Sequence, residues 1–265
     1  MSEALPAVFV SHGAPTLAIE PSPARGFLAE LGCDLDGRFA RPSAVLVVSA
    51  HWETAAATVS VAEQPATIHD FGGFPDELYR IRYLVPGAEA AAREAAALLE
   101  EAGIAVEFNA GRGLDHGAWI PLCLMYPQGN VPVSQISLQT HLGPRHHLRV
   151  GQALRPLRAH GVLILGSGQL THNLRDLSSG RPGDPEPPYV SEFLEWLRAR
   201  AEAADVEALL DYRRQAPHAA RNHPSEEHLL PFFTVLGAAT PGRGLRRIHR
   251  STTFGFLRMD AYEAP

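Results

Sequence analysis

The sequence has only two cysteines among its 265 residues, Cys33 and Cys123. They form neither a Cys-x-x-Cys pair nor a disulfide framework, which disfavours a cysteine-rich structural zinc site. Long apolar runs are also missing: none approaches the ~18 residues of a membrane span. The N-terminus lacks a basic region followed by an apolar stretch, so it does not resemble a signal peptide. We therefore expect a cytoplasmic protein without a membrane partner.

Positive charge and nucleotide-binding motifs are scarce as well. The 23 Lys and Arg residues against 29 Asp and Glu residues give a net charge of −6, whereas nucleic-acid binders need a basic face. No Gly-x-Gly-x-x-Gly follows a predicted strand, and no P-loop is present. The 45% hydrophobic and 20% charged residues are an ordinary globular mixture. We expect no nucleic-acid partner and a monomer or small homo-oligomer.

Short apolar runs alternate with helical segments along the chain. Runs rich in Val, Ile and Leu without polar alternation are typical of strands that are covered on both faces. We predict such strands at Ala7–Val10, Ala44–Ser49, Val131–Leu138 and Val162–Leu165, a further strand at Thr252–Met259, and helices at Glu89–Ala102, Leu148–Ala159 and Ser191–Leu210. This order predicts one α/β domain over residues 1–265, with a mostly parallel or mixed central sheet flanked by helices.

Three finer features of these segments are predicted from proline and serine positions. Pro156 should kink the second helix, and Ser191 should cap the start of the third. The segment Ser178–Pro188 is rich in proline and glycine but short, so we interpret it as a surface loop rather than a domain boundary.

Histidines are plentiful, thirteen in all, and three of them follow predicted strands through small residues. One strand leads into Ser11-His12-Gly13, another into Ser49-Ala50-His51-Trp52, and a third into Gly166-Ser167-Gly168 and then His172. In open α/β sheets, ligands bind at the carboxyl ends of the strands. One such histidine would most simply be a hydrogen-bonded loop residue, but three in the same context predict a metal site at that edge of the sheet.

A further donor segment runs from Asn222 to Pro231. Ser225 followed by two acids resembles a helix start, and that helix would carry His228 near its N-terminus until Pro231 breaks or kinks it. His228 or Glu227 could point at a metal, whereas Glu226 is better explained as a solvated charge. His223 is predicted to be structural.

Two glycine-rich segments carry additional candidates. Asp115-His116 lies between glycines, which suits an acid–base histidine or, equally, a capping turn before a helix at Trp119–Met125. The loop His69–Pro75 could cover a flat substrate or be an ordinary turn.

Most remaining histidines are predicted to lie on the surface: His146, His147, His160, His218 and His249, with His141 a weak site candidate. Three serines that follow strands, Ser11, Ser49 and Ser167, must be considered as nucleophiles, but none lies in a Gly-x-Ser-x-Gly elbow.

Taken in order, these motifs resemble those of the class III (LigB-type) extradiol ring-cleavage dioxygenases. The resemblance rests on Ser11–Pro15, Ser49–Trp52, Asp115–Trp119, Gly166–Gly168 with His172–Leu174, and His223–His228. It extends from about Pro6 to about Leu257. The DOPA 4,5-dioxygenase branch is the more similar one, and its loop resembles His69–Pro75.

This resemblance implies a single non-haem metal, Fe(II) in the working enzyme, held by His12, His51 and His228. Distant relatives place a glutamate in the third position, so Glu227 is the alternative to His228. His172 would lie at the metal, either as a further ligand or as the acid–base residue, and His116 would be a second catalytic histidine of the pocket. Trp52, His69 and Phe74 are the predicted substrate contacts.

The implied reaction opens the ring of a DOPA-like catechol with O₂ to give a semialdehyde acid. A histidine with a near-neutral pKa could remove and return the protons. The alternative is a zinc-dependent hydrolase that uses the same histidines, with Glu227 as general base. Zinc could also occupy the iron site in purified protein. A binding protein without activity is a third hypothesis, which the intact donor positions disfavour.

Overall fold

A computed structural model describes residues 4–178 and 185–265, so residues 179–184 of the predicted loop Ser178–Pro188 lie outside the described residues. Within these ranges, an eight-stranded mixed sheet has the order β4-β3-β5-β2-β6-β1-β10-β7. Its strands are β1 (Ala7–Ser11), β2 (Ala44–Glu53), β3 (Ala57–Ser60), β4 (Val106–Asn109), β5 (Val133–Leu138), β6 (Val162–Gly168), β7 (Arg246–His249) and β10 (Ala261–Ala264). The prediction of an α/β domain with a mostly parallel or mixed sheet is confirmed.

The centre of the sheet is parallel and its edges are mixed. Strands β5, β2, β6 and β1 run parallel to one another, whereas β10 is antiparallel to both β1 and β7, and β3 is antiparallel to β5. All residues of β1, β5 and β6 are buried, as their Val- and Leu-rich sequences predicted. The short strands β3, β4, β7 and β10 were not predicted.

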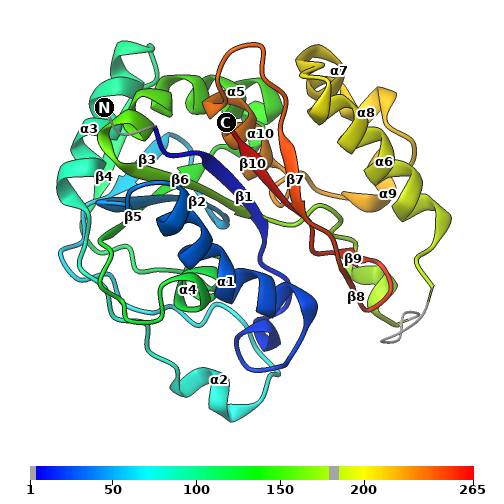
Figure 1. The fold of residues 1–265 in the computed structure, drawn as a ribbon, viewed down its shortest axis with the longest axis horizontal. Helices are drawn as coiled ribbons and strands as arrows, with labels where there is room; N and C mark the ends of the chain where they lie inside the picture. The colour runs from blue at the N-terminus through cyan, green and yellow to red at the C-terminus, as the bar shows by residue number, and fades with distance from the viewer. Residues whose placement is uncertain (1–3, 179–184) are drawn as a thin grey trace.

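Helices cover both faces of the sheet (Figure 1). Trp119 on α4 and Leu28 on α1 belong to one apolar core, while α3, α5, α6 and α10 contribute to the other. The helices are α1 (Pro23–Arg38), α2 (Asp76–Arg80), α3 (Glu89–Glu101), α4 (His116–Met125), α5 (Gly143–Leu154), α6 (Pro188–Glu202), α7 (Val206–Leu210), α8 (Tyr212–Gln215), α9 (Ala219–Asn222) and α10 (Leu230–Ala238). None of the helices within the described ranges has the length and apolarity to cross a membrane.

Close packing of α5 on α10 depends on two glycines. A Cβ at Gly151 would lie 1.9 Å from the Thr234 carbonyl oxygen, and one at Gly237 would lie 2.0 Å from that of Leu148. Both distances are far below van der Waals contact, so the backbones of the two helices could not approach this closely with any other residue at either position.

Several predicted boundaries were wrong. The helix predicted at Leu148–Ala159 begins earlier, at Gly143, and gives way after Leu154 to a 3₁₀ helix over Arg155–His160 that has Pro156 in its first turn. The helix predicted at Ser191–Leu210 is two helices, α6 and α7, because Ala204 adopts a left-handed φ of 55°. Its first turn holds Pro188, and Ser191 donates to the Pro188 carbonyl instead of capping the helix.

Two predictions near the C-terminus were also wrong. The strand predicted at Thr252–Met259 is a hairpin of β8 (Thr252–Thr253) and β9 (Leu257–Arg258), because Phe254 and Gly255 both adopt positive φ and reverse the chain. The helix predicted to start at Ser225 begins only at Leu230. Pro231 does not break that helix, because it lies in the first turn, where a missing N–H costs no hydrogen bond.

Candidate metal centre

The three strands that were predicted to carry histidines are neighbours. β6 lies between β2 and β1, all three are parallel, and Ser49 pairs with Ser167 while Ser11 pairs with Gly168. Their carboxyl ends therefore lie at one edge of the sheet. Gly168 permits the chain to pass there, since a Cβ at this position would lie 2.1 Å from the His228 carbonyl oxygen.

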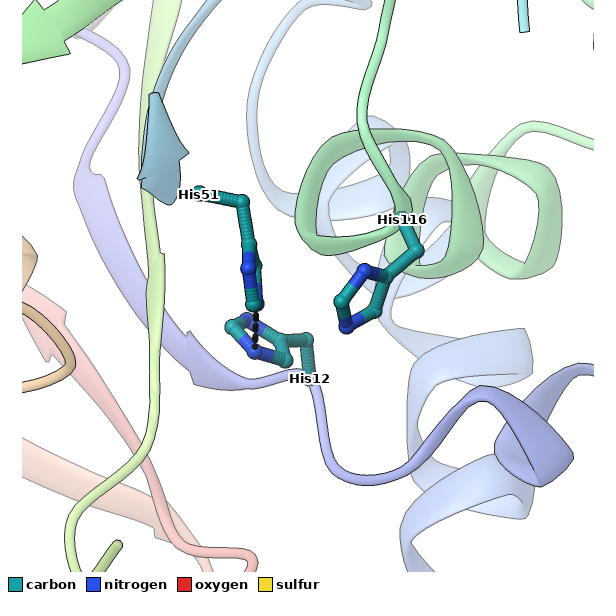
Figure 2. A group of neighbouring side chains, drawn as sticks. All are labelled: His12, His51 and His116. Carbon is teal, nitrogen blue, oxygen red and sulfur yellow. Dashed lines mark hydrogen bonds between the residues drawn. The ribbon is translucent and has the colours of Figure 1, made fainter. Parts of the chain in front are cut away.

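Three histidines from regular elements meet at this edge (Figure 2). His12 directly follows β1, His51 lies on β2, and His116 is the first residue of α4. The Nε2 atoms of His12 and His51 are 3.1 Å apart. The ring centroid of His116 lies 4.0 Å from that of His51 and 5.4 Å from that of His12. We call these residues the strand group. Their nitrogen atoms are close enough together to hold a metal ion.

A second group comes from irregular segments and consists of His172, Glu227 and His228, which we call the loop group. The His228 ring contacts both His12 and His51, at centroid distances of 5.4 and 4.9 Å. His172 stacks on His228 at 3.4 Å with an interplanar angle of 12°. His12, His51 and His228 therefore contact one another pairwise, as expected of three ligands to one ion.

Glu227 lies behind His228. Its Oε1 accepts a hydrogen bond from His228 Nδ1 at 3.0 Å and another from the Ser225 hydroxyl at 3.0 Å. The same oxygen is 4.0 Å from His172 Nδ1. This position is suited to a carboxylate that orients His228 and is less suited to one that replaces His228 as the ligand.

In three cluster histidines, His12, His116 and His228, Nδ1 takes part in a hydrogen bond, so Nε2 is the nitrogen that could bind a metal or substrate. The Ser167 hydroxyl donates to the Gly117 carbonyl and therefore accepts from His12 Nδ1, at 3.1 Å. His116 Nδ1 donates to Asp70 at 3.0 Å, as His228 Nδ1 does to Glu227. Metal-binding histidines commonly donate their second ring N–H to a carboxylate or another acceptor in this way.

Burial favours the neutral form of His12, His51, His172 and His228. It lowers the pKa of His12 and of His228 well below the usual value, and the neighbouring histidines lower both further. Burial and the nearby His116 lower the pKa of His51 to about 4. The pKa of His172 is lowered by burial, against the opposing effect of Glu227. Neutral imidazole is the form that binds a metal, so the donor set fits a divalent transition-metal ion.

Asp115 ties the end of β2 to the start of α4. It is fully buried, and it accepts hydrogen bonds from Ser49 Oγ at 2.6 Å, Gln135 Nε2 at 2.9 Å and Arg112 Nη2 at 2.7 Å. It also caps α4 by accepting from the Ala118 amide at 3.1 Å. Because His116 follows Asp115 directly and the bonded Ser49 is two residues before His51, Asp115 holds together the two backbone segments that carry these histidines.

Sequence reasoning missed three residues of this hydrogen-bond network. Asp115 precedes His116 and Asp70 follows His69, but the neighbouring sequence does not indicate which groups the two carboxylates contact. Gln169 follows Gly168. Its side-chain oxygen accepts a hydrogen bond from the Gly13 backbone amide at 3.0 Å, and its backbone amide donates to the His228 carbonyl at 2.9 Å. It thereby joins the segments that carry His12 and His228.

The serines that were considered as nucleophiles are engaged elsewhere. All three are buried, and their hydroxyls donate to Asp260 O, Asp115 Oδ1 and Gly117 O for Ser11, Ser49 and Ser167, respectively. A nucleophilic serine commonly donates its hydroxyl to a histidine base, whereas the acceptors here are two backbone carbonyls and a carboxylate. These contacts favour a structural role for each.

The three predicted substrate contacts pack against residues other than the cluster histidines. Trp52 is buried beneath the Arg112 guanidinium, which is 5.0 Å from its ring. His69 faces the Ile81 carbonyl through Nε2 at 3.1 Å, and Phe74 packs on Phe71. The loop His69–Pro75 reaches the histidines through two other residues, Asp70 and Phe71.

Outside the cluster, the structure corrects one histidine in particular. His147, predicted to lie on the surface, is buried: its Nδ1 donates to the Gly143 carbonyl at 2.8 Å and its Nε2 accepts from the Gln139 amide at 3.2 Å. The earlier start of α5 places it on the inner side of that helix. His146 and His249 are half-buried, His141, His160 and His218 are exposed, and His223 is buried with Nε2 2.8 Å from the Leu170 carbonyl, in agreement with its predicted structural role.

Comparison with known proteins identifies the class to which this fold and site belong. Residues 6–255 match the family described as the catalytic LigB subunit of aromatic ring-opening dioxygenase. The chain belongs to this LigB family, whose dioxygenases are non-haem metal enzymes. It is an extradiol ring-cleaving dioxygenase, as its motifs implied, and nothing in the comparisons supports the hydrolase alternative.

Individual relatives cover nearly the full length of the chain. A 4,5-DOPA dioxygenase extradiol from Beta vulgaris is 40% identical over 259 residues, which are 96% of this chain and 94% of that protein. One from Escherichia coli K12 is 36% identical over 241 residues, 89% of this chain and 86% of that protein. The crystal structure of an uncharacterized protein from Escherichia coli K12 superposes with a TM-score of 0.81 at 29% identity, covering 98% of this chain and 100% of that one.

Proposed function

We propose that this enzyme opens the ring of DOPA or a close catechol analogue, with Fe(II) held by His12, His51 and His228. The motifs of the family imply this ligand set, and the pairwise contact of its three rings at 4.9, 5.4 and 4.9 Å is the observation that supports it. Relatives named 4,5-DOPA dioxygenase extradiol at 40% and 36% identity support the substrate. All three ligands are neutral, which leaves the ion its full positive charge to attract a catecholate.

The bound metal would supply a Lewis-acidic centre with open positions where catechol and O₂ meet. The residues of the chain would then remove protons from the substrate and return them. We assign His172 as the acid–base residue, because it stacks on His228 but is not part of the pairwise contacts among the three ligands. Its lowered pKa leaves it neutral, so it can take a proton from a catechol hydroxyl and return it later. Glu227, 4.0 Å from its Nδ1, would stabilise the protonated form.

His116 would serve a different purpose. Its Nδ1 donates to Asp70, so in the neutral ring Nε2 is the nitrogen that can accept a hydrogen bond. Because the His116 ring contacts both His12 and His51, this acceptor is adjacent to two of the proposed ligands. It is therefore placed to accept a hydrogen bond from a substrate hydroxyl and to orient the ring. The same position would allow it to contact O₂.

The test is reconstitution without oxygen. Metal-free protein is loaded anaerobically with Fe(II), then mixed with aerated buffer and a panel of catechols that includes DOPA, protocatechuate and a meta-substituted catechol. Oxygen uptake with a growing yellow absorbance is expected, fastest with DOPA. A matched Zn(II)-loaded sample should show neither. Uptake with another catechol but not with DOPA would overturn the substrate. No uptake with any of them, together with ester or amide hydrolysis by the zinc form, would overturn the proposed reaction.

A further inference from the structure

The loop His69–Pro75 contacts the histidine cluster through a carboxylate. Asp70 Oδ1 accepts two hydrogen bonds from His116, one from its backbone amide at 2.9 Å and one from Nδ1 at 3.0 Å. The other carboxylate oxygen lies 3.6 Å from Nδ1 of His51. The Asp70 side chain is 25% exposed, so most of it lies within the protein.

Asp70 determines which nitrogen of His116 carries the proton. An ionised carboxylate only accepts hydrogen bonds, so in the neutral imidazole of His116 the proton is on Nδ1 and Nε2 is the free acceptor. The hydrogen bond also sets the ring's orientation, and Figure 2 shows the ring turned toward His12 and His51. Without this partner, either nitrogen of a neutral imidazole could carry the proton.

Two further contacts restrain the same histidine. The bond from the His116 amide holds the first residue of α4, an N–H that has no partner within the helix. Phe71, the neighbour of Asp70, contacts the His116 ring at 5.7 Å and nearly at right angles, while His51 contacts it at 4.0 Å. The loop thus fixes the position of His116 by its backbone, its Nδ1 and its ring.

We infer that Asp70 is a positioning residue for the ring-opening reaction: it holds His116 as the Nδ1–H tautomer with Nε2 directed at the site where substrate binds. The inference rests on the proposed function, in which His116 accepts a hydrogen bond from the catechol. It gives the glycine-rich loop a role in the orientation of the site. The residues that do this are Asp70 and Phe71, and not the predicted substrate contacts His69 and Phe74.

The first experiment uses metal-free protein, so it is independent of activity. Protein labelled with ¹⁵N at histidine is examined by NMR, and the His116 signals are assigned with His116→Gln. In the wild type, His116 should show a protonated Nδ1 and a bare Nε2. Asp70→Ala should shift it toward a mixture of tautomers, and Asp70→Asn should restore the wild-type pattern in part, because an amide oxygen can still accept from Nδ1. An unchanged His116 spectrum in Asp70→Ala would overturn the inference.

The second experiment measures turnover of the Fe(II)-loaded enzyme. Asp70→Ala should lower kcat by about 10–100-fold, Asp70→Asn should recover part of this loss, and Asp76→Ala, an exposed carboxylate on α2, should match the wild type. Wild-type kcat in Asp70→Ala would overturn a role in the reaction even if the tautomer changes. If wild-type enzyme takes up no oxygen, the proposed function fails, whereas the NMR result still decides whether Asp70 sets the His116 tautomer.

Discussion

The strand group and the loop group supply histidines to one site but are held in different ways. His12, His51 and His116 come from the end of β1, from β2 and from the first residue of α4. Their neighbours form a hydrogen-bond network through the buried Ser167 and Asp115 and through Asp70. His172 and His228 come from the segment after β6 and from the turn before α10, and Glu227 is the carboxylate beside both.

This difference indicates that metal binding and proton transfer depend on differently held residues. Side chains on strands and helices are held more precisely than side chains on loops, as metal ligands require. A proton carrier needs some contact with solvent, and within the loop group the His172 side chain is 21% exposed against 6% for the proposed ligand His228. The contrast predicts that changes at the two proposed ligands of the strand group, His12 and His51, abolish metal binding, whereas a change at His172 impairs the chemistry alone.

The largest effect is expected for His12→Ala. This change removes a ligand from the centre of the cluster, where His12 contacts His51, His116 and His228. Metal content, measured by elemental analysis after loading and desalting, should fall to background, and oxygen uptake should disappear. Circular dichroism should show a folded protein. Full metal content in this variant would contradict the assignment of the strand group as the main metal holder.

His172→Phe should separate the two groups most clearly. Phenylalanine retains the stacking on His228 but carries no proton, so metal binding should persist while ring opening slows by about 10²–10⁴-fold. Metal content and the rate of yellow product formation are measured on the same sample. Loss of the metal would make His172 a ligand and would remove the distinction between the groups. A control with His141→Phe, an exposed histidine, should change neither quantity.

Gly117→Ala should weaken metal binding in the strand group through packing alone. A Cβ at this position would lie 2.6 Å from the Ser49 hydroxyl and 3.0 Å from His51 Cδ2, so His51 must move. We expect metal affinity to fall by about 10–100-fold, measured by competition with a chelator. Gly26→Ala on α1, where a Cβ meets nothing within 4 Å, is the matched control. Equal affinity in the two variants would show that the strand group tolerates displacement.

The smallest effect concerns His147, which is buried but belongs to neither group. Burial lowers its pKa to about 4, against the opposing hydrogen bond to Gly143. The unfolded chain binds a proton below about pH 6.5 and the folded protein only near pH 4, so the folded state loses stability as the pH falls through this interval. At pH 5 this amounts to about 2 kcal/mol.

His147→Gln keeps an acceptor for the Gln139 amide but does not titrate. Its unfolding free energy, measured with urea, should therefore fall less between pH 7 and pH 5 than that of the wild type. The exposed His160→Gln should behave like the wild type. An equal pH dependence in all three proteins would show that burial of His147 does not contribute to acid sensitivity, and would leave the site histidines as its source.

The central strands and the site histidines could be predicted locally, and the edges of the fold could not. Apolar runs indicated β1, β2, β5 and β6 because strands covered on both faces have that composition. The four-residue strands β3 and β4 have no comparable pattern, since they are stabilised by pairing: β4 pairs with β3, and β3 also pairs with β5. The hairpin at Phe254 was missed because an aromatic residue with positive φ gives no turn signal in the sequence.

The sequence alone determined the chemistry of this protein: histidines placed through small residues after apolar strands, and motifs whose order implied the LigB family. Only the tertiary structure decided that β6 lies between β2 and β1, that His228 and not Glu227 faces the other histidines, and that Asp70 pairs with His116, 46 positions along the chain. The physical reason is that residue type fixes what a side chain can donate or bind, whereas its partners depend on packing between distant segments.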